Sequence, residues 1–285
     1  MNTFLSELGK KLAERWVSLL VLPGVLFTAL TATASLLGHR DALDWPRLSH
    51  AAEDLVDRCQ HRPVSAVLLS LVILTAGAAF GLLARGLGTV VERIWLISGP
   101  AWLVSRLIRR RRDRWTRADA AAEQAPTAAS AALADTRNAI ALTQPARPTW
   151  IGDQLRGVGV RVQGEYGLDF PFTWPRLWIL LPESCRNDLI AAREAMANAS
   201  AQSGWGLLYL SLGIQWWPAA AAGAVLLFLG WRRGREGVAN LANLTESAVD
   251  LYAADLARSL GVDLPSGRVT PDVGKRLSER FRKGA

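Results

Sequence analysis

Between Gly204 and Trp231 no side chain is ionisable except that of Tyr209, and this restricts the chain more than any other feature. Such a run belongs in lipid or in a wholly buried protein core, because both environments exclude unpaired charge. As one helix it would be roughly 40 Å long, whereas the apolar core of a bilayer is about 30 Å thick. The alternative is a hairpin that folds back around Pro218.

Backbone chemistry and the placement of tryptophan both favour the hairpin. Pro218 lacks an amide hydrogen and disfavours helix at the residue before it, so a turn is expected there. In a single span Trp216 and Trp217 would lie near the bilayer centre, although Trp prefers the headgroup level. In a hairpin these two residues lie at one interface, and Trp205 and Trp231 lie at the other.

The charges that follow the run favour the same fold. Arg232 and Arg233 come directly after it, and arginines near the end of a membrane helix tend to stay in the cytoplasm. Each arm of the hairpin is short for a full crossing, so a single span remains the alternative.

The composition restricts the partners of the chain. Half of the 285 residues are hydrophobic, yet the formal net charge is +8, which fits neither a simple soluble domain nor a disordered chain. For a membrane protein the nearest anionic partner is the lipid headgroup. No RNA-binding motif or zinc-finger spacing is present, so nucleic acid is not expected. Cys59 and Cys185 are expected on opposite sides of the bilayer, which excludes a disulfide between them.

The N-terminal part of the chain predicts one span and an amphipathic helix before it. Residues 16–37, which begin at Trp16, carry no charge and are long enough to cross a bilayer. A secretory signal peptide cleaved after residue 34 is the alternative. Residues 1–15 place apolar side chains on one helical face, although an ordinary flanking turn explains them equally well.

All three histidines of the chain lie between residues 38 and 63, in a segment of mixed charge. A metal site or a pH sensor is one hypothesis for this cluster. However, His50 and His61 would be about 16 Å apart on a continuous helix, too far to share an ion. A solvated helix surface is therefore the favoured interpretation.

Residues 64–84 predict a second span, which Arg85 closes. Gly77 and Gly81 form a small-xxx-small pair, which allows another helix to approach closely. Its partner is the first span, the hairpin or a second copy of the chain, and packing within one chain is favoured.

The next segment begins in the interface and ends in a basic run. Residues 86–108 contain only a short apolar stretch, which Gly99-Pro100 interrupts, so an interfacial or re-entrant segment is expected. Four consecutive arginines beside a membrane stabilise contact with anionic lipid by about 1 kcal/mol each. These anchoring residues are Arg109, Arg110, Arg111 and Arg112.

The cytoplasmic portion shows no catalytic pattern. The acids nearest the aromatic, proline-rich stretch 166–182 have no histidine or serine partner of the kind that a nucleophilic site needs. The stretch itself carries too many bulky apolar residues for a solvated loop, so it is expected to bury itself or rest on the membrane. No catalytic, cofactor-binding or metal-binding residue is therefore predicted.

Three stretches carry a family resemblance: RWVSLLVLPGVLF, YGLDFPFTWPRLWILLP and WGLLYLSLGIQWWPAA. Together they resemble uncharacterised multi-pass membrane proteins of high-GC Gram-positive bacteria. The resemblance covers most of the chain and implies a membrane location. It supplies no site residues.

The sequence thus predicts a mainly α, helical integral membrane protein with about four membrane segments and a helical cytoplasmic portion. Both termini are expected in the cytoplasm, at the cell membrane. The predicted order is a cytoplasmic amphipathic helix (1–15), transmembrane 1 (16–37), an external loop (38–63), transmembrane 2 (64–84), an interfacial segment (86–108), a basic and Ala-rich linker (109–148), a cytoplasmic helical region (149–203), a transmembrane hairpin (204–231) and cytoplasmic amphipathic helices (232–285).

The expected function is a membrane-anchored interaction or scaffold protein, without enzymatic activity or cofactor. Its expected partners are a bilayer with anionic headgroups and either a second copy of the chain or a cytoplasmic protein. The alternative is a channel or transporter component, or a membrane-perturbing effector of a bacterial defence or toxin system. Spans without charge argue against an ion pathway, but a homo-oligomer could still enclose a pore.

Overall fold

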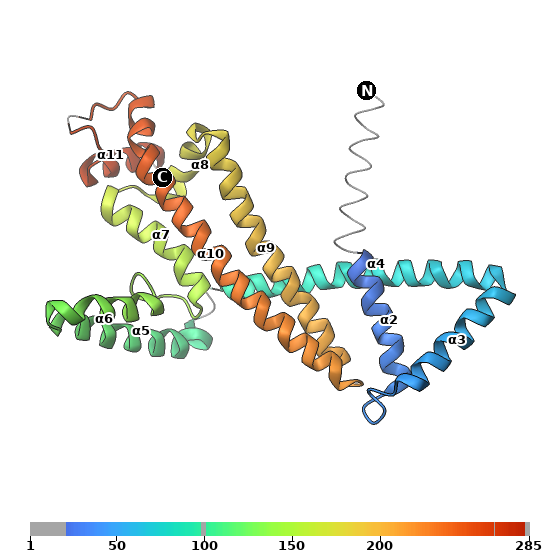
Figure 1. The fold of residues 1–285 in the computed structure, drawn as a ribbon. Coiled ribbons are helices and arrows are strands. Elements are labelled where there is room, and N and C mark those ends of the chain that lie inside the picture. The colour runs from blue at the N-terminus through green and yellow to red at the C-terminus, as the bar shows by residue number, and fades with distance from the viewer. Residues whose placement is uncertain (1–20, 98–100, 265, 283–285) are drawn as a thin grey trace, which may run out of the picture. The chain divides into compact units, whose positions relative to one another are not determined.

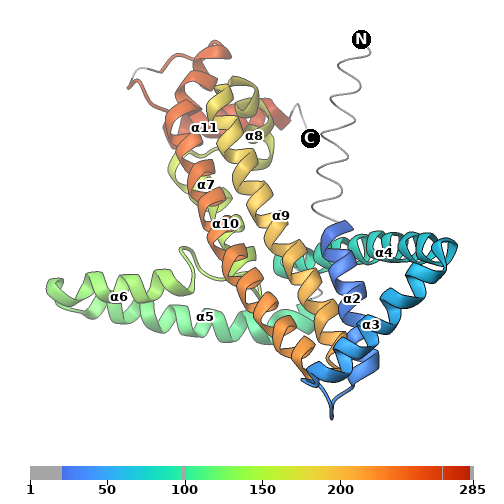
Figure 2. The same ribbon diagram turned by 45° about the vertical axis from the view of Figure 1, so that its right-hand side comes forward.

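The computed structural model describes residues 21–97, 101–264 and 266–282, and over these residues the chain is helical, with no strand. The mainly α prediction is therefore confirmed for this part of the protein. Residues 1–15 and Trp16 lie outside the described residues. The helices, labelled in Figures 1 and 2, are α2 (Leu22–Leu37), α3 (Trp45–His61), α4 (Pro63–Leu96), α5 (Ala101–Gln124), α6 (Thr127–Ile140), α7 (Trp150–Tyr166), α8 (Phe170–Leu180), α9 (Glu183–Leu212), α10 (Trp217–Ser259) and α11 (Pro271–Arg282).

The chain divides into two compact units. The first unit consists of Met1–Val91 and Ala199–Trp231, and the second unit consists of Glu92–Asn198 and Arg232–Ala285. Three long helices, α4, α9 and α10, contribute residues to both. Among the described residues, one helix is long and apolar enough to cross a membrane, Val64–Leu96 of α4, and Leu22–Leu37 is a shorter apolar helix.

The stretch 204–231 folds back on itself, as the hairpin prediction required. In Figures 1 and 2 the end of α9 and the start of α10 run side by side. The turn lies a few residues earlier than predicted, because α9 ends at Leu212 and α10 already begins at Trp217. Pro218 stands in the first turn of α10, where a missing amide hydrogen leaves no helical bond unmade. Proline here starts a helix instead of making the turn.

Close approach of the two arms depends on glycine. A Cβ on Gly223 would lie 2.7 Å from the backbone nitrogen of Leu210 and 2.8 Å from the carbonyl oxygen of Gly206. Any larger residue at Gly223 would push the arms apart. Small residues at such contacts are characteristic of helix pairs in membranes.

Helix α4 crosses α2 at Gly77. In Figure 1 α4 runs across α2, and a Cβ on Gly77 would lie 2.9 Å from the nitrogen of Val25. The partner of Gly77 is thus the first predicted span of the same chain. Gly81 is also buried.

The helices do not follow two of the predicted segment boundaries. Helix α4 does not end near Arg85 but continues to Leu96, so residues 86–96 continue the helix of the predicted second span. A single arginine does not interrupt a helix, because its intrinsic helix propensity is high. The predicted linker 109–148 is also mostly helical: α5 and α6 lie side by side in Figures 1 and 2.

Specific contacts hold this α5–α6 hairpin together. Alanine has the highest helix propensity, so an Ala-rich segment needs few additional contacts to remain helical. Trp115 donates its indole hydrogen to the carbonyl of Ala141 at 2.8 Å. Arg137 pairs with Asp119 at 2.8 Å between the two helices.

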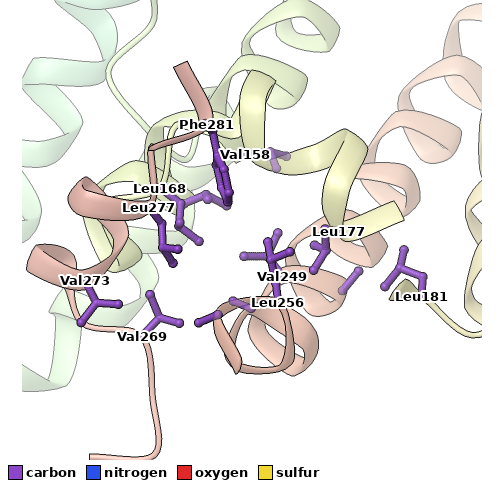
Figure 3. Packing of buried hydrophobic residues seen from close by; sticks show 14 of the residues in the cluster. Val158, Leu168, Leu177, Leu181, Val249, Leu256, Val269, Val273, Leu277 and Phe281 are labelled. Atoms are coloured by element: carbon purple, nitrogen blue, oxygen red, sulfur yellow. The ribbon is translucent and has the colours of Figure 1, made fainter. Parts of the chain in front are cut away.

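The core of the second unit is built from α7, α8, α10 and α11. Figure 3 shows side chains from these helices meeting, among them Val158, Leu177, Val249 and Leu277. Leu177 and Val249 are completely buried. The apolar face of α11, formed by Val273, Leu277 and Phe281, is also buried in this core. The proline-rich stretch 166–182 contributes Leu168, Leu177 and Leu181 to this core, whereas Ile179 of the same stretch is 75% exposed.

Candidate functional site

The first half of α4 exposes apolar side chains in almost every direction. Six of them show between 51% and 72% of their surface: Val64, Val67, Leu68, Leu71, Val72 and Leu74. Because exposed apolar surface of this extent is rare on soluble monomers, it marks a place where lipid or another protein is expected.

The rest of the first unit has the same character. Leu22, Val225 and Phe228 expose 67%, 56% and 57% of their surface. Its interior is a small aromatic cluster in which Phe27 meets Tyr209 edge-on, with ring centroids 5.2 Å apart. The unit therefore packs a few aromatic residues inside and leaves aliphatic residues outside.

At one end of the first unit, the turn of the hairpin contacts the segment that follows α2. The Trp216 indole donates to the carbonyl of Ala42 at 2.9 Å, and His39 Nε2 lies 2.7 Å from the carbonyl oxygen of Ile214. The predicted external loop and the hairpin turn thus meet at the same end. Among the described residues, no three His, Cys, Asp or Glu side chains are placed to hold a metal ion.

The tryptophans predicted as interface anchors occupy different environments. Trp217 and Trp231 expose 48% and 44% of their surface near the two ends of the α10 arm. Trp205 instead packs beside Phe27, at 6.1 Å between ring centroids. Its ring is partly buried against the interior aromatic cluster, and its anchoring role stays a prediction.

The predicted anchoring arginines also separate into groups. Six of them are exposed: Arg85, Arg109, Arg110, Arg112, Arg232 and Arg233. Arg232 lies 3.1 Å from Glu236 one turn further along α10.

Arg111 departs from the anchoring prediction because its guanidinium turns inward. It pairs with Asp153 at 2.9 Å and donates to the carbonyl of Ile140. Asp153 is only 3% exposed and also accepts the backbone amides of Ala146 and Arg147, each at 2.8 Å. This carboxylate therefore fixes the segment before α7, a role that was not predicted.

An apolar hollow lies within the second unit, between α7, α8, α9 and α10. Its volume is about 440 Å³, within the range of roughly 300–1,000 Å³ that is usual for ligand sites. One wall is a row of aromatic rings on α8, spaced four residues apart. Ring centroids are 5.4 Å apart between Phe170 and Trp174 and 5.9 Å apart between Trp174 and Trp178.

Few polar groups line this cavity. Arg193 of α9 pairs with Glu92 at 2.5 Å, and Glu194 follows it. The Thr245 hydroxyl donates to the carbonyl of Leu241 at 2.6 Å. The sequence predicted that these aromatic residues are buried or rest on the membrane, but it did not predict a hollow among them. The four-residue spacing of the three rings was the available signal.

A second feature of the same unit is a tyrosine held in its protonated form. Burial, followed by the hydrogen bond to Asp250 at 2.7 Å and the charges of Asp250 and Glu165, raises the pKa of Tyr166 to about 12. At neutral pH Tyr166 is therefore a hydrogen-bond donor and not a base.

Comparison with protein-family models, with curated proteins and with solved structures finds no match.

Proposed function

We propose that the protein is a membrane-anchored interaction protein. The first unit lies in the bilayer with about four membrane segments: residues 16–37, the apolar part of α4 and the two arms of the hairpin. The second unit is its cytoplasmic portion. The observation that carries the proposal is the exposed apolar surface of α4, which water would solvate poorly.

The proposed orientation rests on the two ends of the hairpin. Its turn lies with the segment after α2, which is short and carries mixed charge, so this end is assigned to the outside. The other end runs into Arg232 and Arg233. Because positive charge close to a membrane helix tends to remain in the cytoplasm, that end is assigned to the inside.

The arms of the hairpin are short within this proposal. Residues 199–212 and 217–231 each correspond to roughly 20 Å of helix, against a bilayer core of about 30 Å. Both helices continue beyond the first unit, so the arms are not limited to this length. Local thinning of the bilayer is the usual response to such a mismatch.

The interaction surface is assigned to α5. Four exposed arginines recur on one face of this helix at spacings of three or four residues: Arg106, Arg110, Arg114 and Arg117. Such a stripe suits an anionic surface, and beside a membrane the nearest one is the cytoplasmic leaflet. No enzymatic activity forms part of the proposal.

The topology is tested by labelling single cysteines in intact cells with a membrane-impermeant maleimide. In a background where Cys59 and Cys185 are replaced by serine, Ile214→Cys at the hairpin turn is expected to react from outside. Ala132→Cys, exposed on α6, is expected to react only after the cells are permeabilised. Reaction of Ala132→Cys in intact cells would refute the assigned orientation. Recovery of the intact protein as a soluble monomer without detergent would refute the membrane location.

A further inference from the structure

We propose that the cavity of the second unit binds a single-chain amphiphile, with its hydrocarbon chain among the helices and its polar head at Arg193. This goes beyond the proposed function, because every lining residue belongs to the second unit. The ligand class is shared by free fatty acids and lysophospholipids.

The shape of the lining favours a chain over a compact ligand. Phe170, Trp174 and Trp178 succeed one another over two turns of α8, a length of about 12 Å. Leu155 and Val158 of α7 are also among the lining residues. The volume lies in the lower half of the usual range for ligand sites, which favours one chain over the two of a diacyl lipid.

The hydrogen bonding of the lining residues favours a ligand whose buried part is apolar. The Thr245 hydroxyl is engaged by the carbonyl of Leu241. Apart from Arg193, Glu194, Thr245 and the indole groups of the two tryptophans, the lining side chains carry no polar atom. A hydrocarbon chain against these apolar side chains leaves no polar group of the ligand unpaired.

The charges locate the head group. Arg193 and Glu194 lie one turn further along α9 than the apolar lining residues Leu189 and Ile190. The Arg193 side chain is half exposed, and its contact with Glu92 uses one terminal nitrogen. A guanidinium has five N–H donors, so Arg193 can hold a carboxylate or phosphate oxygen while it keeps Glu92.

The experiment is photolabelling of the full-length protein in phosphatidylcholine nanodiscs. The probes are diazirine-bearing analogues of palmitic acid, of palmitoyl-lysophosphatidylethanolamine and of palmityl alcohol, and the labelled peptides are identified by mass spectrometry. We expect label on peptides from α8 and the first part of α9, and we expect excess unlabelled palmitic acid or lysolipid to remove it. Labelling by only one of the fatty-acid and lysolipid probes would identify the source of the ligand within the class.

Two substitutions on α7 separate binding in the cavity from general partition into lipid. Leu155→Trp fills the cavity and is expected to reduce the labelling roughly tenfold, the factor that loss of about two buried methylene contacts causes. Val160→Trp, on the same helix but outside the lining and 42% exposed, is expected to leave the labelling unchanged. Equal labelling of both variants, or label without competition in the unmodified protein, would overturn the proposal.

The head-group assignment has its own test. Arg193→Gln is expected to weaken labelling by the palmitic acid probe and to leave labelling by the palmityl alcohol probe unchanged. An equal loss for both probes would refute a role for Arg193 at the head group. All readouts are peptides of the second unit, so the result does not depend on the topology of the first.

Discussion

In the first unit Leu71 and Val72 expose 60% and 63% of their surface, whereas in the second unit Leu177 and Val249 expose none. The first unit packs small residues and a few aromatic rings inside and presents aliphatic side chains outward. The second unit buries a large cluster of aliphatic side chains and pairs many of its charges. The same chain thus follows two packing rules, which is expected if one unit is solvated by lipid and the other by water.

Truncation of a leucine to alanine should distinguish the two units most strongly. Leu177→Ala is expected to destabilise the second unit by about 2–5 kcal/mol, because a completely buried leucine leaves a cavity. Leu71→Ala in the first unit is expected to change stability by less than about 0.5 kcal/mol. Chemical denaturation in mild detergent measures both. Equal losses at the two sites would contradict the contrast.

Removal of the Asp153 carboxylate should produce the next largest effect. Asp153→Ala leaves Arg111 and the amides of Ala146 and Arg147 without their acceptor, so a loss of about 1–3 kcal/mol is expected. Asp113→Ala, on the exposed side of α5, is the matched control and should remain within about 0.5 kcal/mol. If Asp153→Ala leaves the stability unchanged, the segment before α7 is held by other contacts.

The helix crossing in the first unit provides a test of steric fit. Gly77→Leu should cost about 1–3 kcal/mol, because its side chain would collide with the backbone of α2 at Val25. Gly86→Ala lies on the same helix with open space around the new methyl group, and it should be neutral or slightly stabilising. Unfolding in a denaturing-detergent titration compares the two. If Gly77→Leu is tolerated as well as Gly86→Ala, α4 does not cross α2 at this residue.

Alkaline pH should have the smallest effect, confined to the second unit. The pKa of Tyr166 is raised from 10.0 to about 12, so between these values the native state keeps a proton that the unfolded state releases. Stability from this source is complete below about pH 10 and falls as pH rises towards 12.

The phenolate absorbance of the native protein measures this ionisation. Its difference from Tyr166→Phe is expected to show one group titrating near 12. A group that titrates at 10.0 in that difference would rule out the arrangement with Asp250.

The hairpin and the close helix contact at Gly77 could be predicted from local features of the sequence. A proline after two tryptophans restricts the backbone, and glycines in an apolar run indicate close helix contact. The exact turn was missed, because Pro218 suits the first turn of a helix as well as a turn. Because these signals depend only on neighbouring residues, they can be recognised without knowledge of the tertiary fold.

Long-range contacts account for what the sequence did not predict. The α5–α6 hairpin was interpreted as a linker because alanines give little amphipathic pattern, and its stabilising pair joins Arg137 to Asp119 across two helices. The burial of Asp153 depends on Arg111, far away in the chain. The cavity needs four helices to enclose it, so the spacing of Phe170, Trp174 and Trp178 alone could not define it.

The central claim is that lipid covers the exposed face of α4. A nitroxide at Leu71→Cys, in the cysteine-free background and in nanodiscs, reports collisions with oxygen and with a water-soluble nickel chelate. If lipid surrounds Leu71, we expect frequent collisions with oxygen and few with nickel, because oxygen concentrates in the bilayer and the chelate is excluded from it. Frequent collisions with nickel would contradict the account and place α4 in water.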